Sequence, residues 1–241
     1  MHRFFVAPEA IDGSKVSIKG KQAYQISRVL RMKPGDEITV LDNSGAQYQV
    51  KLAAVNKKQI TGDIVYSSPC PNEPSLHVHL YQALLKGDKF DFVLQKCTEI
   101  GVASFTPIIC ERSISRHVST TRMSRWQTII MEAAEQSHRA RMPLLQPLIS
   151  FTKACHLAMG VSLLAWEGEK APPLRTALPD QRPDAITIFI GPEGGFSFQE
   201  VEFARSKGIT PVTLGKRILR AETAALVAAS IVLYEYGDLG C

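Results

Sequence analysis

The sequence is poor in paired cysteines, in long apolar runs and in familiar nucleotide-binding fingerprints, and each absence excludes a class of protein. The five cysteines are odd in number, widely spaced and never arranged as Cys-x-x-Cys, so neither a disulfide framework nor a zinc cluster is predicted. A reducing cytoplasm is the expected location, and no metal is expected. The cysteines are Cys70, Cys97, Cys110, Cys155 and Cys241.

Long apolar runs are missing throughout the chain. No segment approaches the roughly 18 uninterrupted apolar residues that a membrane-spanning helix needs. The opening stretch, MHRFFVAPEAIDGS, has neither the apolar core nor the cleavage site of a secretory signal peptide. We therefore expect a cytoplasmic protein with no membrane partner.

Two nucleotide-binding fingerprints are also absent. No Gly-x-Gly-x-x-Gly motif is present, and the phosphate-binding loop motif fails because Gly215-Lys216 is followed by Arg217 instead of Ser or Thr. The sequence therefore disfavours a dinucleotide or a nucleoside triphosphate as ligand.

The composition that is present suits a globular protein with a mildly basic surface. The 241 residues are 45% hydrophobic and 21% charged, which is enough chain for one large or two modest domains. Lys and Arg number 28 against 23 acidic residues, so the net charge is +5. This excess suits a polyanionic partner such as nucleic acid, although many soluble proteins share it.

The chain divides into a strand-rich first part and an alternating second part. Alternating apolar residues and turn signals up to about residue 66 predict a small β-barrel or sandwich, interrupted by a short helix with a basic side at 21–32. Residues 67–75 contain three prolines and are predicted to be an irregular linker. The second part predicts strands at 76–85, 104–110, 161–167, 185–191 and 210–215 and helices at 88–101, 121–139, 197–208 and 221–236. Strands that alternate with helices indicate a mainly parallel sheet covered on both faces.

Three segments that directly follow predicted strands are candidates for a ligand site, because ligands of open parallel sheets bind outside the carboxyl ends of the strands. They are Ala165–Gly168, Gly191–Gly195 and Leu214–Arg217. The glycines of Gly191–Gly195 permit close backbone approach, and Ser197 with Glu200 can cap the following helix. The alternative is a tight strand-to-helix turn without a ligand.

The last predicted helix is apolar nearly all round and should be buried. It begins near Ala221, and Glu222 lies in its first turn, where a carboxylate suits the positive end of a helix. Its alanines allow close packing against a second subunit. The alternative for Leu214, Ile218, Leu219 and Leu226 is an ordinary place in the core.

Several motifs together resemble one family. GPEGGFS, LGKRILRAETA, KGDK with QKCTEIGV and Pro107, EAAEQSHR, and MHRFF with RVLRM occur in order. Over nearly the whole chain this pattern resembles the RsmE family, the 16S rRNA uracil-N3 methyltransferases of the SPOUT superfamily.

The resemblance implies an α/β protein in which a PUA-like, RNA-binding β-barrel at 1–70 precedes a SPOUT α/β domain at 74–241, with a C-terminal trefoil knot at about 160–241. It implies a homodimer that transfers a methyl group from S-adenosyl-L-methionine to N3 of a specific uridine in 16S rRNA, as free RNA or in the small ribosomal subunit. The alternatives are an RNA-binding ribosome-assembly factor on the same fold and a SPOUT enzyme that modifies another RNA position.

The resemblance also assigns the cofactor to the three strand-end segments and the start of the last helix. The implied cofactor-binding residues are Leu164, Ala165, Trp166, Gly191, Pro192, Glu193, Gly194, Gly195, Leu214, Gly215, Ile218, Leu219, Arg220, Thr223 and Ala224.

The chemistry of uracil N3 directs attention to Arg220 and to the neighbouring acids. The guanidinium of Arg220 is a suitable partner for charge that develops on the uracil oxygens, although a salt bridge to Glu222 or Glu193 is an equal alternative. Glu222 is the catalytic carboxylate we select, while Glu193, Glu132, a water molecule or ionised uridine stay open as the base.

RNA contacts are expected from basic side chains in both parts and from the helix that carries EAAEQSHR, where Glu132, Gln136 and Arg139 should share a face. Phe4 and Phe5 are either core residues or stacking platforms, and His77 and His79 are interpreted as packed or surface residues rather than metal ligands. The selected RNA-binding residues are Arg3, Arg28, Arg31, Lys86, Lys89, Glu132, Gln136 and Arg139, with Lys19, Lys21, Lys33, Arg112, Arg116 and Arg125 as further candidates.

Overall fold

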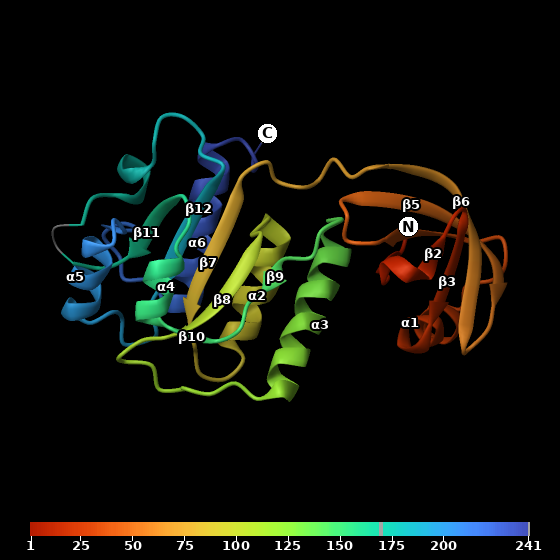
Figure 1. Cartoon of the computed structure of the whole chain (residues 1–241), viewed down its shortest axis with the longest axis horizontal. Coiled ribbons are helices and arrows are strands. Elements are labelled where there is room, and N and C mark those ends of the chain that lie inside the picture. Colours follow the sequence, from red (N-terminus) through yellow and green to blue (C-terminus); the bar gives the residue numbers. More distant parts are fainter. Residues whose placement is uncertain (169–170, 241) are drawn as a thin grey trace. The chain divides into compact units, whose positions relative to one another are not determined.

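A computed structural model describes residues 1–168 and 171–240 (Figure 1). The chain forms two compact units, and each is treated separately. The half-barrel unit contains residues 1–73 together with 134–142, and the α/β unit contains 74–133 together with 143–241. Cys241, the last of the cysteines and the end of the predicted second domain, lies outside the described residues.

The half-barrel unit is built on a six-stranded sheet that curls around one apolar core. The strand order is β1-β4-β5-β6-β3-β2, and every pair is antiparallel except the parallel pair β1/β4. Register shifts between β5 and β6 increase the bend of the sheet. Its strands are β1 Arg3–Phe5, β2 Ile11–Asp12, β3 Lys15–Lys19, β4 Glu37–Leu41, β5 Ala46–Val55 and β6 Gln59–Pro69.

The short basic helix predicted in this unit is confirmed. It consists of α1 (Gly20–Tyr24) followed by a π-helical turn at Gln25–Val29. Ala23 and Ile26 face the core and are fully buried, whereas Arg28 is exposed.

The predicted linker is partly wrong. β6 continues to Pro69 because residues 67–69 pair with Tyr48, Gln47 and Ala46 at the start of β5. A proline at the end of a strand removes no essential hydrogen bond, so the three prolines exclude regular structure only from residue 70 onward.

The α/β unit contains a parallel sheet with the order β10-β8-β7-β12-β11-β13, and β9 pairs with β8. All its strand pairs are parallel, as the alternation of strands and helices predicts. β12 lies between β7 and β11, so the central strands come from distant parts of the chain. The strands are β7 His77–Ala83, β8 Ser104–Ile109, β9 Leu144–Leu145, β10 Ile149–Ser150, β11 Val161–Ala165, β12 Ala185–Ile190 and β13 Thr210–Val212.

Helices cover both faces of this sheet (Figure 1). Helix α6 packs on β7, β12 and α2, while α4 and α5 contact each other and share a core with the opposite face. Helix α4 was not predicted, because its seven residues are too few to display a helical period. The helices are α2 Lys89–Ile100, α3 Thr120–Gln136, α4 Phe151–Leu157, α5 Phe198–Ser206 and α6 Ala221–Glu235.

Local signals in the sequence fix several helix ends. Ser197 and Glu200 form the expected capping box at the start of α5. Gly101 ends α2 in the left-handed region with φ 113°, and α6 begins at Ala221 as predicted. These ends position the loops that follow β12 and β13.

Candidate cofactor and substrate site

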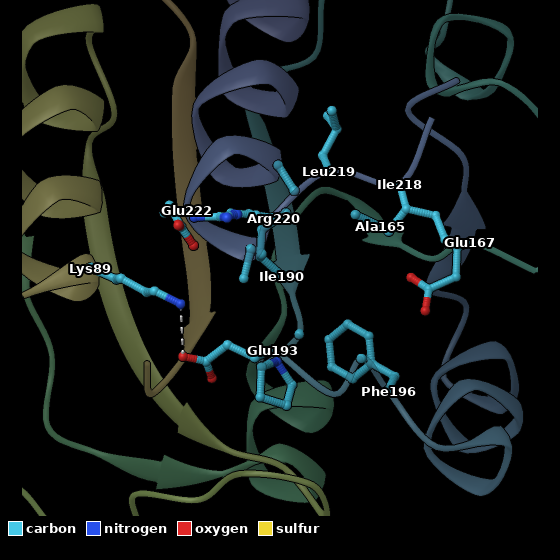
Figure 2. A pocket seen from close by; sticks show the side chains of 15 residues that line it. Lys89, Ala165, Glu167, Ile190, Glu193, Phe196, Ile218, Leu219, Arg220 and Glu222 are labelled. Atoms are coloured by element: carbon cyan, nitrogen blue, oxygen red, sulfur yellow. Dashed lines mark ion pairs between the residues drawn. The ribbon is translucent and has the colours of Figure 1, made fainter. Parts of the chain in front are cut away.

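A cavity of about 310 Å³ lies at the carboxyl ends of β11 and β12, beside the first turn of α6 (Figure 2). Two of the three strand-end segments selected from the sequence, Ala165–Gly168 and Gly191–Gly195, therefore meet at one place with the start of the last helix, whereas no residue of Leu214–Arg217 lines the cavity. The predicted cofactor residues that line it are Ala165, Gly191, Pro192, Glu193, Gly195, Ile218, Leu219, Arg220 and Ala224.

In the loop after β12, Gly191 and Gly195 line the cavity with main-chain atoms because glycine has no side chain. Gly195 has φ +67°, and a Cβ there would lie 3.1 Å from Oε1 of Glu167. A Cβ on Gly191 would lie 3.2 Å from the ring of Phe196. Glycine is therefore required at Gly195 by its backbone conformation, and both positions favour close approach of a ligand to the main chain.

Glu193 ties this loop to the loop after β7. Its Oε1 accepts a hydrogen bond from the backbone N–H of Lys86 at 3.0 Å and forms an ion pair with Nζ of Lys89 at 3.5 Å (Figure 2). Burial alone would raise the pKa of Glu193, but the N–H of Lys86, its own N–H and the Lys89 ammonium together lower that pKa. Glu193 is therefore a stabilised carboxylate and a weak proton acceptor.

Two further contacts fix the same loop from the side of β8. Arg112 donates a hydrogen bond to the carbonyl of Gly194 at 2.8 Å. Glu200 accepts the N–H of Ser197 at 2.9 Å with one oxygen and the N–H of Glu111 at 2.8 Å with the other. Sequence reasoning identified Glu200 only as a capping residue, because nothing in the sequence places Glu111 beside it.

Arg220 and Glu222 stand at the start of α6, on the cavity wall (Figure 2). Arg220 is the N-cap residue, its carbonyl accepts the N–H of Ala224 at 2.8 Å, and its side chain is exposed. None of the ion pairs formed by the described residues involves Arg220, so the alternative of a salt bridge to Glu222 or Glu193 does not hold.

The carboxylate of Glu222 differs from that of Glu193. Its Oε2 is buried and has no hydrogen-bond partner within the part of the chain that the structure describes. The positive end of α6 stabilises the negative charge there. An unpaired buried acceptor is unfavourable, so a hydrogen-bond donor brought to this oxygen by a bound molecule would stabilise Glu222.

The rest of the wall combines apolar surface with charge of both signs. Ile190, Phe196 and Ile218 supply apolar surface, and Ile218 is 82% exposed. Carboxylates come from Glu167, Glu193 and Glu222, and positive charge comes from Lys89 and Arg220. Such a wall suits a small molecule that carries both a flat ring and a cationic centre.

Some predicted cofactor residues lie just outside the lining. Leu164 is fully buried in the core on the α4/α5 side, with Trp166 packed against it, and Thr223 is exposed on α6. The predicted residues outside the lining are Leu164, Trp166, Gly194, Leu214, Gly215 and Thr223. The lining residues not predicted for the cofactor are Lys89, Glu167, Ile190, Phe196, Ala221 and Glu222.

Comparison with known proteins assigns both units to one family. Residues 71–233 match the family described as an RNA methyltransferase domain, and residues 26–65 match an RNA methyltransferase PUA domain. The chain is 36% identical to ribosomal RNA small subunit methyltransferase E of Synechocystis sp., covering 94% of this chain and 75% of the relative. It is 31% identical to the protein of the same name from Bacillus subtilis, covering 98% and 97%.

The chain belongs to the ribosomal RNA small subunit methyltransferase E family. Two solved structures agree with this assignment. The family protein of Neisseria gonorrhoeae, solved with S-adenosyl methionine, has a TM-score of 0.89, 34% identity and 97% coverage of both chains. A protein of Legionella pneumophila, solved with the cofactor SAM, has a TM-score of 0.88, 30% identity and 96% coverage of both chains. The family resemblance read from the sequence motifs is thus confirmed.

In this methyltransferase E family member, the residues selected for RNA contact divide between exposed and buried positions. Glu132 and Gln136 are exposed on α3, Lys86 is exposed, and Lys89 is paired with Glu193 in the cavity wall. In the half-barrel unit Arg28 and Arg31 are exposed, whereas Arg3 donates to Oε1 of Gln47 at 3.3 Å.

The shared helix face predicted for Glu132, Gln136 and Arg139 is wrong for Arg139. Helix α3 ends at Gln136, and His138 adopts a positive φ of 61°, which turns the chain out of the helix. Arg139 is 4% exposed and pairs with Glu73 at 3.1 Å, and Glu73 also accepts the N–H groups of residues 140 and 141. Arg139 is therefore a structural residue of the half-barrel unit.

The aromatic pair and the two histidines are the remaining residues for which the sequence left alternatives open. Phe4 and Phe5 are 2% and 4% exposed, so they are core residues and not platforms for stacking. Among the described residues there is no group of three or more potential metal ligands. Within the same residues, none of the helices is long and apolar enough to span a membrane.

Proposed function

We propose that this chain transfers a methyl group from S-adenosyl-L-methionine to N3 of a specific uridine in 16S rRNA. The observation that carries the proposal is the cavity in which the Gly191–Gly195 loop meets Arg220 and the unpaired carboxylate of Glu222. The family assignment supports the substrate class, since curated relatives are named for the small ribosomal subunit RNA.

The residues present fit the proposed cofactor. When bound, S-adenosylmethionine supplies a methyl group attached to a positively charged sulfur. Ile190, Phe196 and Ile218 would hold its apolar ring, the glycine loop would receive it with backbone groups, and Glu167 and Glu222 would balance its charge. The structures of two relatives that contain this cofactor support the choice.

The catalytic task for the protein is to remove the N3 proton and to stabilise the resulting charge on uracil. Glu222 would accept the proton, a role supported by its place in the cavity lining beside Arg220 and by the lack of a hydrogen-bond partner at its Oε2 among the described residues. Arg220 would donate to O2 or O4 of the uracil, where the negative charge is delocalised. The lone pair freed on N3 would then accept the methyl group, while the sulfur–carbon bond would break and its electron pair would stay on the sulfur of S-adenosylhomocysteine.

The structure gives a reason to prefer Glu222 among the open candidates for the base. Glu193 is held by Lys86 and Lys89, and its lowered pKa makes it a poorer proton acceptor. Glu132 is exposed on α3 and does not line the cavity. Glu222 lines the cavity, and none of the described residues forms a hydrogen bond with its Oε2.

The finer features of the family resemblance belong to the same proposal. The trefoil knot is supported by the path of the chain, which reaches the sheet edge at β13 and then returns in α6 to pack on β12, β7 and α2. The homodimer is supported by the half-buried apolar side chains Leu226, Val227 and Ile231 on α6. We also propose a cytoplasmic location, where ribosomal RNA is found.

Calorimetric titration with S-adenosylmethionine tests the enzyme against an RNA-binding assembly factor that has lost catalysis. The enzyme predicts saturable binding at one site per chain, and the heat should disappear when S-adenosylhomocysteine already fills the cavity. Absence of binding to folded protein would favour the assembly factor.

A further inference from the structure

A second cavity, of about 510 Å³, lies in the α/β unit on the face of the sheet that α4 and α5 cover only in part. It shares no lining residue with the first cavity. Its floor is formed by the amino-terminal halves of β7 and β8, whereas the first cavity lies at the carboxyl ends of the strands.

The floor of this cavity is polar, which is unusual for a parallel sheet. Strands covered on both faces normally read as continuous apolar runs. Here His79 pairs in register with Ser104, and Tyr81 pairs with Thr106. His77 and Thr187 extend the same face, whereas the neighbouring positions on the opposite face are the apolar residues Val78, Leu80, Phe105 and Ile186.

Burial and hydrogen bonds hold the polar side chains of the floor in place. Ser104, Thr106 and Tyr81 are 8%, 4% and 7% exposed, so these residues are more than nine-tenths buried although they line a cavity. Nδ1 of His79 lies 2.7 Å from Oγ of Ser104, and the hydroxyl of Tyr81 donates to the carbonyl of Leu157 at 3.4 Å. Burial, and then repulsion from His77, lowers the pKa of His79, which keeps its ring neutral near pH 7.

The rim supplies a different set of groups. Leu144, Leu157 and Met159 are 60%, 50% and 54% exposed and form an apolar border. The amide of Gln146 and the ammonium of Lys153 complete the rim. The neutral polar floor and the ammonium of Lys153 therefore favour a ligand that is neutral at one end and anionic at the other.

We propose that this second cavity binds one unpaired nucleotide of the RNA substrate, with the base on the polar floor and a phosphate at Lys153. A splayed-out base offers a flat face to the neutral imidazole and the apolar rim, and an edge to the hydroxyls and to Gln146. The inference rests on the proposed function only in taking RNA as the substrate. Because this cavity is separate from the first, the bound nucleotide is an anchoring nucleotide and not the one that is methylated.

The test uses the full chain saturated with S-adenosylhomocysteine, so that the first cavity is filled. Adenosine, uridine, cytidine and guanosine 5′-monophosphates are titrated by calorimetry, and a short single-stranded oligoribonucleotide then competes with the best of them. We expect saturable binding of at least one mononucleotide and tighter binding of the oligoribonucleotide. The variants Gln146→Leu and Lys153→Met change side chains on the rim and should each weaken binding about tenfold.

Lys207→Met is the matched control, because Lys207 is exposed over the ring of Phe203 and lines neither cavity. It should leave nucleotide affinity unchanged, and all three variants should keep wild-type affinity for S-adenosylmethionine. The inference is overturned if no mononucleotide binds, if the rim variants bind like the control, or if the oligoribonucleotide binds more weakly than the mononucleotide. Methyl transfer by wild-type protein from the same preparation, assayed with S-adenosylmethionine and without S-adenosylhomocysteine, shows separately whether the proposed function holds.

Discussion

The two cavities of the α/β unit lie against the same parallel sheet but are formed by different parts of it. The first is formed by loops beyond the strand ends, where glycines expose backbone and charged side chains of both signs meet. The second is formed by the side chains of the strands themselves, beside a helix of only seven residues. A contiguous loop motif therefore makes a site visible in the sequence, whereas side chains at alternating strand positions hide one.

The largest expected effect concerns the backbone of the first cavity. Gly195→Val should abolish S-adenosylmethionine binding, because a branched side chain is strained at φ +67° and would crowd Glu167. Calorimetry measures the affinity. Gly208→Val is the matched control, since Gly208 also has a positive φ but faces open space. Equal loss of cofactor binding in both variants would mean that backbone strain alone is responsible.

The next effect concerns charge at the start of α6. Arg220→Ala should lower the rate of methyl transfer about a thousandfold, with little change in cofactor affinity, because a guanidinium that stabilises the uracil anion acts mainly in the transition state. Single-turnover transfer of labelled methyl measures the rate. Arg217→Ala, which removes an exposed guanidinium three residues earlier, should react like the wild type. Comparable losses in both variants would reduce the role of Arg220 to general RNA attraction.

A smaller effect should separate the two carboxylates. Glu222→Gln should slow transfer about a hundredfold, since an amide cannot accept the N3 proton. Glu193→Gln should cost less than about tenfold, because its amide oxygen still accepts the N–H of Lys86. Transfer rates with saturating cofactor measure both. If Glu193→Gln proves the more damaging change, Glu193 and not Glu222 is the base.

The smallest effect belongs to the second cavity and depends on pH. His79 has a pKa below 6.5 in the folded protein, so the unfolded chain binds its proton more readily and the folded state loses stability as the pH falls through 6.5. Between about pH 7 and pH 5.5, the wild-type melting temperature should fall more than that of His79→Gln, by on the order of 1–2 °C.

The matched control for that measurement is His2→Gln, because His2 is exposed and distant from the sheet floor in sequence. Its melting temperature should follow the wild type at every pH. Identical pH dependence in the wild type and His79→Gln would contradict a buried, neutral imidazole.

Much of the first cavity could be predicted from sequence because its parts are local. The Gly191–Gly195 loop, the Ser197–Glu200 cap and the start of α6 at Ala221 are each encoded within a few residues, and the parallel-sheet rule places such loops together. Lys89 was assigned to RNA instead, because nothing local indicates that the first residue of α2 faces Glu193.

The errors have a common cause in long-range contacts. Residues 67–69 join β6 because they pair with the start of β5, and Arg139 leaves its helix because Glu73, 66 residues away, binds it. The polar floor of the second cavity is likewise hidden in the sequence, because the register that places Ser104 and Thr106 beside this strand is a property of the folded sheet.

The most direct measurement of the central claim is the identity of the modified nucleoside. Small-subunit RNA from a strain that lacks this enzyme is incubated with the purified protein and S-adenosylmethionine carrying a labelled methyl group, then digested and resolved by mass spectrometry. The account predicts one labelled product, N3-methyluridine, which Arg220→Ala fails to form. Label in another nucleoside, or none with folded protein that binds the cofactor, would contradict it.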